Sequence, residues 1–100
     1  MNKYETVIIV SDKIGEKETK NVIKKIKKFI KDNGEIIEAE DMGMRKLAYE
    51  IRKSQYGHYF RIFFKAEPEM IAELERTYRI TEEILKFITL RIEKCDWKEN

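Results

Sequence analysis

The sequence has few residues that break or cross-link a chain: one Cys, one Pro and four Gly in 100 residues. A single cysteine cannot form an internal disulfide, which fits a reducing compartment. The shortage of Pro and Gly leaves little room for long loops. The longest unbroken apolar run, Val7 to Val10, is far too short to cross a membrane.

Residues typical of catalysis or metal binding are also scarce. His58 is the only histidine, so the chain has no two-histidine metal site, and Cys95 has no partner for a Cys-x-x-Cys motif. The adjacent acids Glu40 and Asp41 are expected in a strand, where neighbours point to opposite faces. No Gly-rich phosphate loop occurs. We therefore expect no enzyme activity, no cofactor and no metal.

Charged residues are abundant, but basic and acidic residues are distributed unevenly along the chain. The sequence has 21 basic and 19 acidic residues, and its formal net charge of +2 is too small to establish nucleic-acid binding. Between Arg45 and Lys65, however, six residues are basic and only Glu50 is acidic. A basic, aromatic segment on a nearly neutral domain suggests a polyanionic partner.

Hydrophobic periodicity predicts four strands and two helices. The expected strands are Tyr4–Val10, Glu35–Arg52, Tyr59–Ala66 and Ile84–Glu93, and the expected helices run from Glu16 to Asn33 and from Glu67 to about Arg79. Gly34 is placed to be a left-handed C-cap residue of the first helix. Gly43 predicts a bulge or kink in a long strand. The lysines along the first helix are more typical of a solvated surface than of a phosphate site.

This order, β-α-β-β-α-β, predicts an α+β ferredoxin-like domain over residues 1–94, with a short polar tail at 95–100. Its four-stranded antiparallel sheet would carry both helices on one face. The first helix should place Ile26 beneath the sheet, with Ile8, Ile62 and Leu90 around it.

The face of the sheet without helices should carry apolar residues. They are expected to be Val7, Ile9, Phe63, Leu85 and Phe87, among the basic residues Arg61, Lys65 and Arg91. An exposed apolar patch favours a binding partner slightly over a wet sheet face. The segment 56–63 keeps only part of the aromatic core of an RNA-recognition motif, so base stacking on Tyr59 or Phe63 stays open.

A more specific pattern combines several short segments. They are Tyr4-Glu5-Thr6, Gly43-x-Arg45-Lys46-Leu47-Ala48-Tyr49-x-Ile51, Gly57-x-Tyr59, Glu67-Pro68-Glu69, Leu74-Glu75-Arg76 and Ile84-Leu85-Lys86. Together they resemble the bacterial small-ribosomal-subunit protein six family over roughly residues 3 to 94. Glu50 stands where that family commonly has proline, which restores a backbone donor to the strand.

The resemblance implies a structural RNA-binding protein without catalysis or cofactor. Members of the family bind the central domain of small-subunit rRNA as a heterodimer with ribosomal protein eighteen. This chain would then be a cytoplasmic component of the ribosome and a monomer when isolated. The candidate RNA-binding residues are Lys3, Arg45, Lys46, Arg52, Lys53, Arg79, Lys86 and Arg91. The candidate partner-binding residues are Tyr59, Phe63, Phe87 and Trp97.

Two other functions fit the same fold. A small ligand-sensing or dimerisation module should self-associate through its sheet and bind a metabolite. An acylphosphatase-like enzyme should offer an arginine after the first strand, where this chain has Ser11-Asp12-Lys13-Ile14-Gly15. A ribosomal protein should instead co-purify with RNA.

Overall fold

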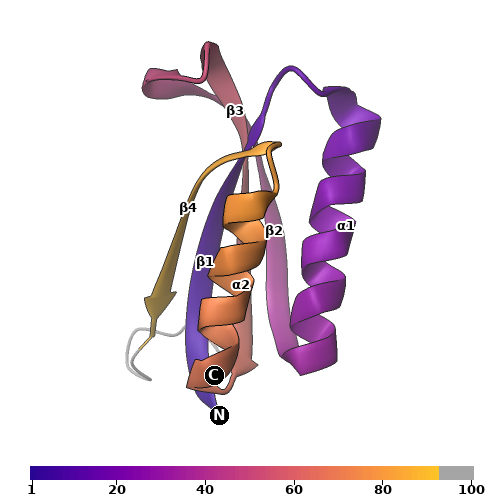
Figure 1. Ribbon diagram of the computed structural model, residues 1–100, viewed down its shortest axis with the longest axis vertical. Helices are drawn as coiled ribbons and strands as arrows, with labels where there is room; N and C mark the ends of the chain where they lie inside the picture. The colour runs from indigo at the N-terminus through magenta and orange to yellow at the C-terminus, as the bar shows by residue number, and fades with distance from the viewer. Residues whose placement is uncertain (93–100) are drawn as a thin grey trace.

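The structure, a computed structural model, describes residues 1–92, and the expected tail with Trp97 lies outside them. The elements are β1 Asn2–Ser11, α1 Gly15–Asn33, β2 Gly34–Ile51, β3 Ser54–Ala66, α2 Pro68–Ile80 and β4 Ile84–Arg91 (Figure 1). The predicted β-α-β-β-α-β order is confirmed. Among the described residues, no helix is long and apolar enough to span a membrane.

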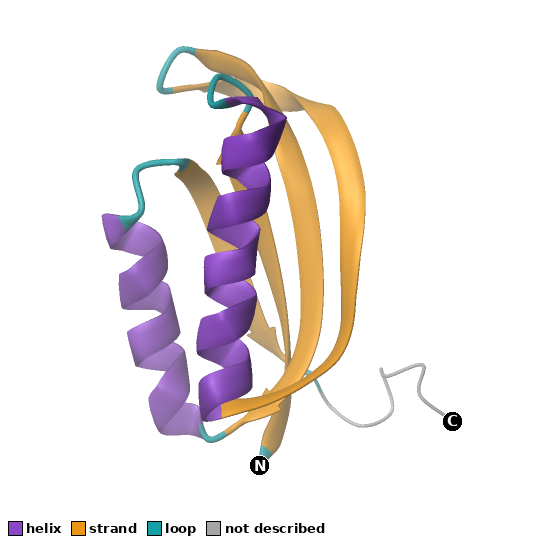
Figure 2. Ribbon diagram, turned by 90° about the vertical axis from the view of Figure 1, so that its right-hand side faces the viewer, coloured by secondary structure: helices purple, strands orange, loops and turns teal. Residues whose placement is uncertain are grey.

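The sheet is antiparallel with the strand order β2-β3-β1-β4. Both helices cover the same face, and the opposite face carries no helix (Figure 2). This is the predicted ferredoxin-like arrangement. We call the face without helices the open face.

The core lies between the helices and the sheet. Ile26, from the apolar stripe of α1, is only 1% exposed and joins Ile8 and Ile62 there, as predicted. The Tyr78 hydroxyl lies 3.0 Å from the hydroxyl oxygen of Thr6, and burial raises the pKa of Tyr78. This shared hydrogen bond satisfies the two buried polar groups.

The C-terminal end of α1 differs from the prediction. Gly34 has φ −172°, so it is extended rather than left-handed, and it begins β2. A Cβ atom on Gly34 would collide with the carbonyl oxygen of Lys65 on β3. Glycine is required here by close approach of two strands and not by backbone handedness.

Gly43 does form the predicted bulge. Its φ is +84°, and the β2–β3 register shifts between Asp41 and Gly43. The Gly43 N–H donates to Oδ1 of Asp41 over 2.9 Å, which satisfies a backbone donor that the bulge removes from the ladder.

A second bulge lies at the start of β4. Ile9 pairs with Lys86, but its neighbour Val10 pairs with Ile84, so Leu85 is an extra residue without a partner on β1. An extra residue reverses which face of the sheet the following side chains occupy.

The bulge corrects the predicted faces of β4. Phe87 packs against the core with its ring centroid 5.0 Å from that of Tyr78, so it is not on the open face. Ile88 and Leu90 are instead 50% and 56% exposed. The predicted packing of Leu90 beneath Ile26 is therefore wrong. Arg91 pairs with Tyr4, which is buried in the core, so Arg91 also leaves the open face.

Candidate nucleic-acid and partner surfaces

The ends of β2 and β3 beyond Gly43, residues 44–56, form an arm that bends toward the β4 side of the sheet (Figure 1). Leu47, 7% exposed, is the buried residue of the β2 part. Gly57 follows the arm, and a Cβ there would meet both Leu47 and Ile9. Because Gly57 places no side chain between Leu47 and Ile9, the arm packs closely onto β1.

Polar contacts hold the arm at three more points. Lys86 Nζ donates to the Tyr49 hydroxyl over 3.1 Å and lies 5.5 Å from the centroid of that ring. The Ser11 and Ser54 hydroxyl oxygens are 3.4 Å apart. Arg52 Nη1 donates to the carbonyl oxygen of Glu82 over 2.9 Å. The arm is thus anchored to β1, to β4 and to the turn before β4.

The tip of the arm is a two-residue turn between the paired residues Ile51 and Ser54. Its central residues, Arg52 and Lys53, both have positive φ, 48° and 67°. Hairpin turns of this kind normally use Gly, Asn or Asp, because other side chains are strained there. Two long cationic side chains occupy these positions instead. The turn is therefore strained, and its tip is positively charged.

The arm cations differ in how far they are already engaged. Arg45 Nε donates to the Met42 carbonyl oxygen over 3.3 Å, and its guanidinium lies 6.0 Å from the Tyr59 ring centroid. Among residues 1–92, the ammonium groups of Lys46 and Lys53 make no hydrogen bond or ion pair, and both side chains are exposed. These two lysines are the most available for an anionic ligand.

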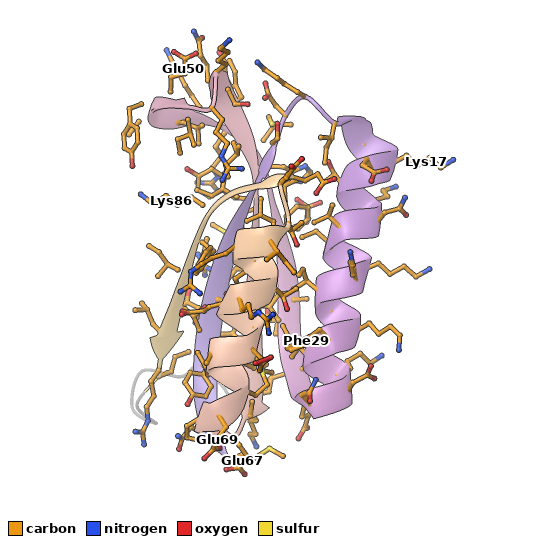
Figure 3. All side chains as sticks on the ribbon, in the orientation of Figure 1. Lys17, Phe29, Glu50, Glu67, Glu69 and Lys86 are labelled. Carbon is orange, nitrogen blue, oxygen red and sulfur yellow. The ribbon has the colours of Figure 1, made fainter. Side chains whose placement is uncertain are left out.

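The other candidate RNA-binding residues are divided between the two ends of the sheet. Lys86 lies below the arm, whose far end is marked by Glu50 (Figure 3). Arg79 is near the end of α2, where it pairs with Glu75 over 3.7 Å. Lys3 and Arg91 lie at the opposite end of β1 and β4 from the arm. The eight candidates therefore do not form one patch.

The open face combines an ion-pair network with apolar residues. Arg61 Nε lies 3.3 Å from Glu5, and its Nη1 lies 3.7 Å from Glu40, so the pairs join β1, β3 and β2. The same guanidinium sits 5.9 Å from the Phe63 ring centroid. Toward β4, the apolar residues Ile88 and Leu90 are exposed.

The candidate partner-binding residues are separated by the structure. Tyr59 and Phe63 are half-buried on β3, paired across the open face with Ile9 and Glu5. Phe87 faces the helices and is not available there. Trp97 lies outside the described residues.

Sequence reasoning missed the exposed pair Ile88 and Leu90, because the bulge that turns them outward has no local signal. It also missed the link between Asp41 and His58. The His58 Nε2 atom lies 2.6 Å from Asp41 Oδ1, and the ring stacks on Phe60 at a centroid distance of 4.3 Å. Partial burial of Asp41 by itself raises its pKa, but the hydrogen bonds from His58 and the Gly43 N–H, with nearby positive charge, bring the pKa below its ordinary value.

Metal chemistry has no site among residues 1–92, where no group of three or more His, Cys, Asp or Glu side chains could hold an ion. The surfaces described above consist of exposed cations, apolar side chains and paired charges. Exposed apolar and cationic side chains of this kind are common at macromolecular interfaces.

Comparison with known proteins places the chain in a family. The family model for ribosomal protein S6 matches residues 3–91. A small ribosomal subunit protein bS6 from Helicobacter hepaticus is 51% identical over 94 residues, which cover 93% of this chain and 69% of that protein. Another protein of that name, from Nitratiruptor, is 44% identical and is covered over 73% of its length.

A solved structure agrees with the sequence matches. The crystal structure of 30S ribosomal protein S6 from Thermotoga maritima has a TM-score of 0.89 with this chain, at 37% identity. The match covers 95% of this chain and 91% of that one. The chain therefore belongs to the ribosomal protein S6 family, and as a ribosomal protein it is cytoplasmic.

Proposed function

We propose that this chain is a structural, non-catalytic component of the small ribosomal subunit. It binds the central domain of small-subunit rRNA together with ribosomal protein eighteen. Membership of the ribosomal protein S6 family supports the proposal over the ligand-sensing and acylphosphatase-like alternatives.

The observation that carries the proposal is a pair of exposed lysines on the arm. Lys46 and Lys53 are exposed and make no ion pair among the described residues, while the arm beneath them is fixed by Arg52 and Lys86. A cation on an anchored arm loses less conformational freedom on binding than one on a mobile loop. Phosphate oxygens are the natural ligands of such lysines, because phosphate contacts position a protein on RNA.

The open face supports the second part of the proposal. Ile88 and Leu90 form an exposed apolar edge beside the Arg61 network. Interfaces between proteins commonly have an apolar centre and a polar rim. We assign this edge, with Phe63, to ribosomal protein eighteen, and the arm to RNA.

Co-purification and titration test this function. The protein should retain small-subunit rRNA after gentle purification, and a transcript of the central domain should bind more tightly when ribosomal protein eighteen is present. Calorimetry should show the two proteins binding directly. A protein that binds neither the transcript nor ribosomal protein eighteen, but forms dimers that take up a metabolite, would contradict the proposal.

A further inference from the structure

A groove of about 960 Å³ lies between α1 and the strands β2 and β3, on the face of the sheet that carries the helices. Its apolar lining comes from both sides: Ile23 from α1, Ala39 from β2, and Phe60 and Ile62 from β3. Ala39 is exposed although it faces the helices beside Ile62. Ile23, Phe60 and Ile62 are buried, so of these four side chains only Ala39, at the β2 edge, is open to solvent.

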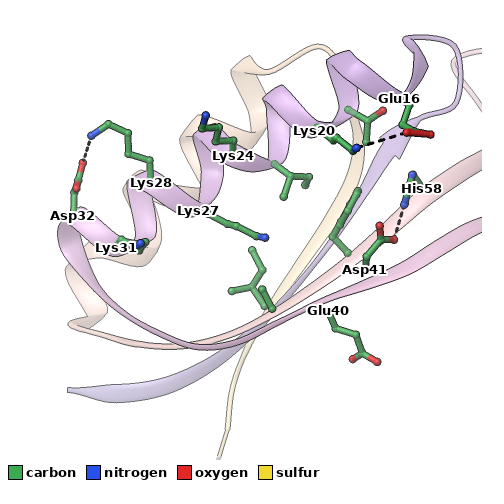
Figure 4. A pocket seen from close by; sticks show the side chains of 15 residues that line it. Glu16, Lys20, Lys24, Lys27, Lys28, Lys31, Asp32, Glu40, Asp41 and His58 are labelled. Atoms are coloured by element: carbon green, nitrogen blue, oxygen red, sulfur yellow. Dashed lines mark hydrogen bonds and ion pairs between the residues drawn. The ribbon is translucent and has the colours of Figure 1, made fainter.

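Five lysines of α1 line the groove (Figure 4): Lys20, Lys24, Lys27, Lys28 and Lys31. Two of these form ion pairs along the helix, Lys20 with Glu16 over 3.6 Å and Lys28 with Asp32 over 3.1 Å.

The other three lysines, Lys24, Lys27 and Lys31, form no ion pair among residues 1–92. They are spaced three and four residues apart, so they follow one side of α1. Figure 4 shows Lys27 reaching from the helix toward the strands. The helix side of the groove therefore carries a row of positive charge.

The strand side compensates this charge only in part. Glu40 turns to the open face, where it pairs with Arg61. Asp41 stays in the groove, where hydrogen bonds from His58 and the Gly43 N–H, together with the positive charge of Lys27, lower its pKa. A carboxylate supplied from outside would therefore meet three lysines opposed by the single charge of Asp41.

The groove also borders an outer edge of the sheet. β2 is the end strand, and between its first two register shifts residues 38–41 pair regularly with β3. The outer edge of this stretch is bordered by no strand of residues 1–92. An extended peptide can pair with such an edge and point alternate side chains toward one side.

From these observations we propose that the groove binds an extended acidic peptide segment of another protein. Its backbone pairs with the outer edge of β2 beside Ala39, and its carboxylates point toward α1, where they contact Lys24, Lys27 and Lys31. Its alternate side chains point away from α1. The part of α1 that lines the groove, Glu16 to Asp32, is about 24 Å long, which corresponds to about seven extended residues. RNA fits less well, because it has no peptide backbone to pair with the outer edge of β2. The proposal does not depend on the RNA and ribosomal protein eighteen contacts assigned above.

The test uses a fluorescein-labelled peptide of about eight residues in which Glu alternates with Val or Ile. Fluorescence anisotropy measures its binding at near-physiological salt. A second peptide has the same composition with all Glu residues in one block. The alternating peptide should bind and the block peptide should bind about tenfold more weakly, because only alternation places acids and apolar groups on separate sides.

Matched variants locate the site. The triple substitution Lys24→Gln, Lys27→Gln, Lys31→Gln should weaken binding roughly tenfold, as expected for three exposed ion pairs. The control Lys13→Gln, Lys17→Gln, Lys25→Gln removes the same charge from lysines that do not line the groove and should leave binding nearly unchanged. Ala39→Trp fills the floor at an exposed position and should abolish binding without unfolding the protein. Binding of the alternating peptide should also shift the backbone amide signals of Ile23 and Ile62 in NMR spectra.

Three results would overturn the proposal. Equal binding of the block peptide would show only general attraction between charges. Equal loss in both triple variants would show that no groove residue is involved. An oligouridine of similar length that displaces the peptide and depends on the same three lysines would identify a nucleic-acid surface instead.

Discussion

Asp41 and His58 link β2 to β3 through a hydrogen bond of 2.6 Å between Oδ1 and Nε2. The pKa of Asp41 is lowered from its ordinary value of 3.8 in the folded protein, even though partial burial opposes that change. A lowered folded pKa stabilises the fold above the unfolded pKa, and this contribution is lost as the pH falls through the folded pKa.

We therefore expect Asp41→Asn to reduce the fall in unfolding free energy between about pH 5 and pH 2. The difference should not exceed about 1 kcal/mol, since the Asp41 side chain is 61% exposed and the pair is partly screened. Urea unfolding at several pH values measures it. Glu50→Gln, which removes an exposed carboxylate that forms no ion pair among residues 1–92, is the control. Identical pH curves for the wild type and Asp41→Asn would contradict the assignment.

A second prediction separates the core from the open face. Ile26→Ala should reduce the free energy of unfolding by roughly 2–5 kcal/mol, because it leaves a cavity at a residue only 1% exposed. Leu90→Ala should reduce it by less than about 1 kcal/mol, because Leu90 is more than half exposed. Urea unfolding tests both variants. A large loss of unfolding free energy in Leu90→Ala would show that Leu90 is in the core, as the sequence alternation predicted.

A third prediction distinguishes two uses of glycine. At Gly34 the obstacle is the Lys65 carbonyl, so Ala and Asn should both destabilise, by roughly 1–3 kcal/mol, and Asn should be no better than Ala. At Gly43 the obstacle is φ +84° with open space around the Cβ position, so Asn should be tolerated better than Ala. Thermal unfolding ranks the four variants. Better tolerance of Asn at Gly34 would indicate a left-handed cap after all.

The element order was predictable because each element has a local pattern. The apolar stripe of α1 and the alternation of β1 need no knowledge of their neighbours, and Glu67-Pro68-Glu69 marks the start of α2. The bulge at Gly43 was predictable for the same reason, since a glycine interrupts a long strand pattern. The family resemblance also rested on contiguous segments, and the family is confirmed.

The errors arose where distant segments determine the structure. The Leu85 bulge is defined by the pairing of β4 with β1, and no glycine near Leu85 reveals it in the sequence. The role of Gly34 depends on Lys65, which lies on another strand. The contact of Arg52 with the Glu82 carbonyl joins residues 30 positions apart, so no local pattern predicts it.

A fourth prediction concerns ribosomal protein eighteen. The double substitution Ile88→Ser, Leu90→Ser should weaken heterodimer formation about tenfold or more in calorimetric titration. The thermal stability of the isolated protein should change little, since both residues are exposed. Ile80→Ser removes an equally apolar side chain that is 72% exposed on α2 and serves as the control. Unchanged affinity in the double variant would place the partner elsewhere.

The fifth prediction concerns the lysines of the arm. Each lysine that contacts an RNA phosphate releases counterions, so its removal should lower the salt slope of binding by about one unit. Lys46→Gln, Lys53→Gln should therefore lower the slope by about two units, because both ammonium groups are available in the described structure. Filter binding of the rRNA central domain over a range of salt concentrations gives the slope. Lys17→Gln, Lys25→Gln makes the same charge change on α1, where Lys17 points away from the arm (Figure 3), and should leave the slope unchanged. Equal slopes for the arm variant and the wild type would show that the arm does not contact phosphate, and its strained, cationic turn would then need another explanation.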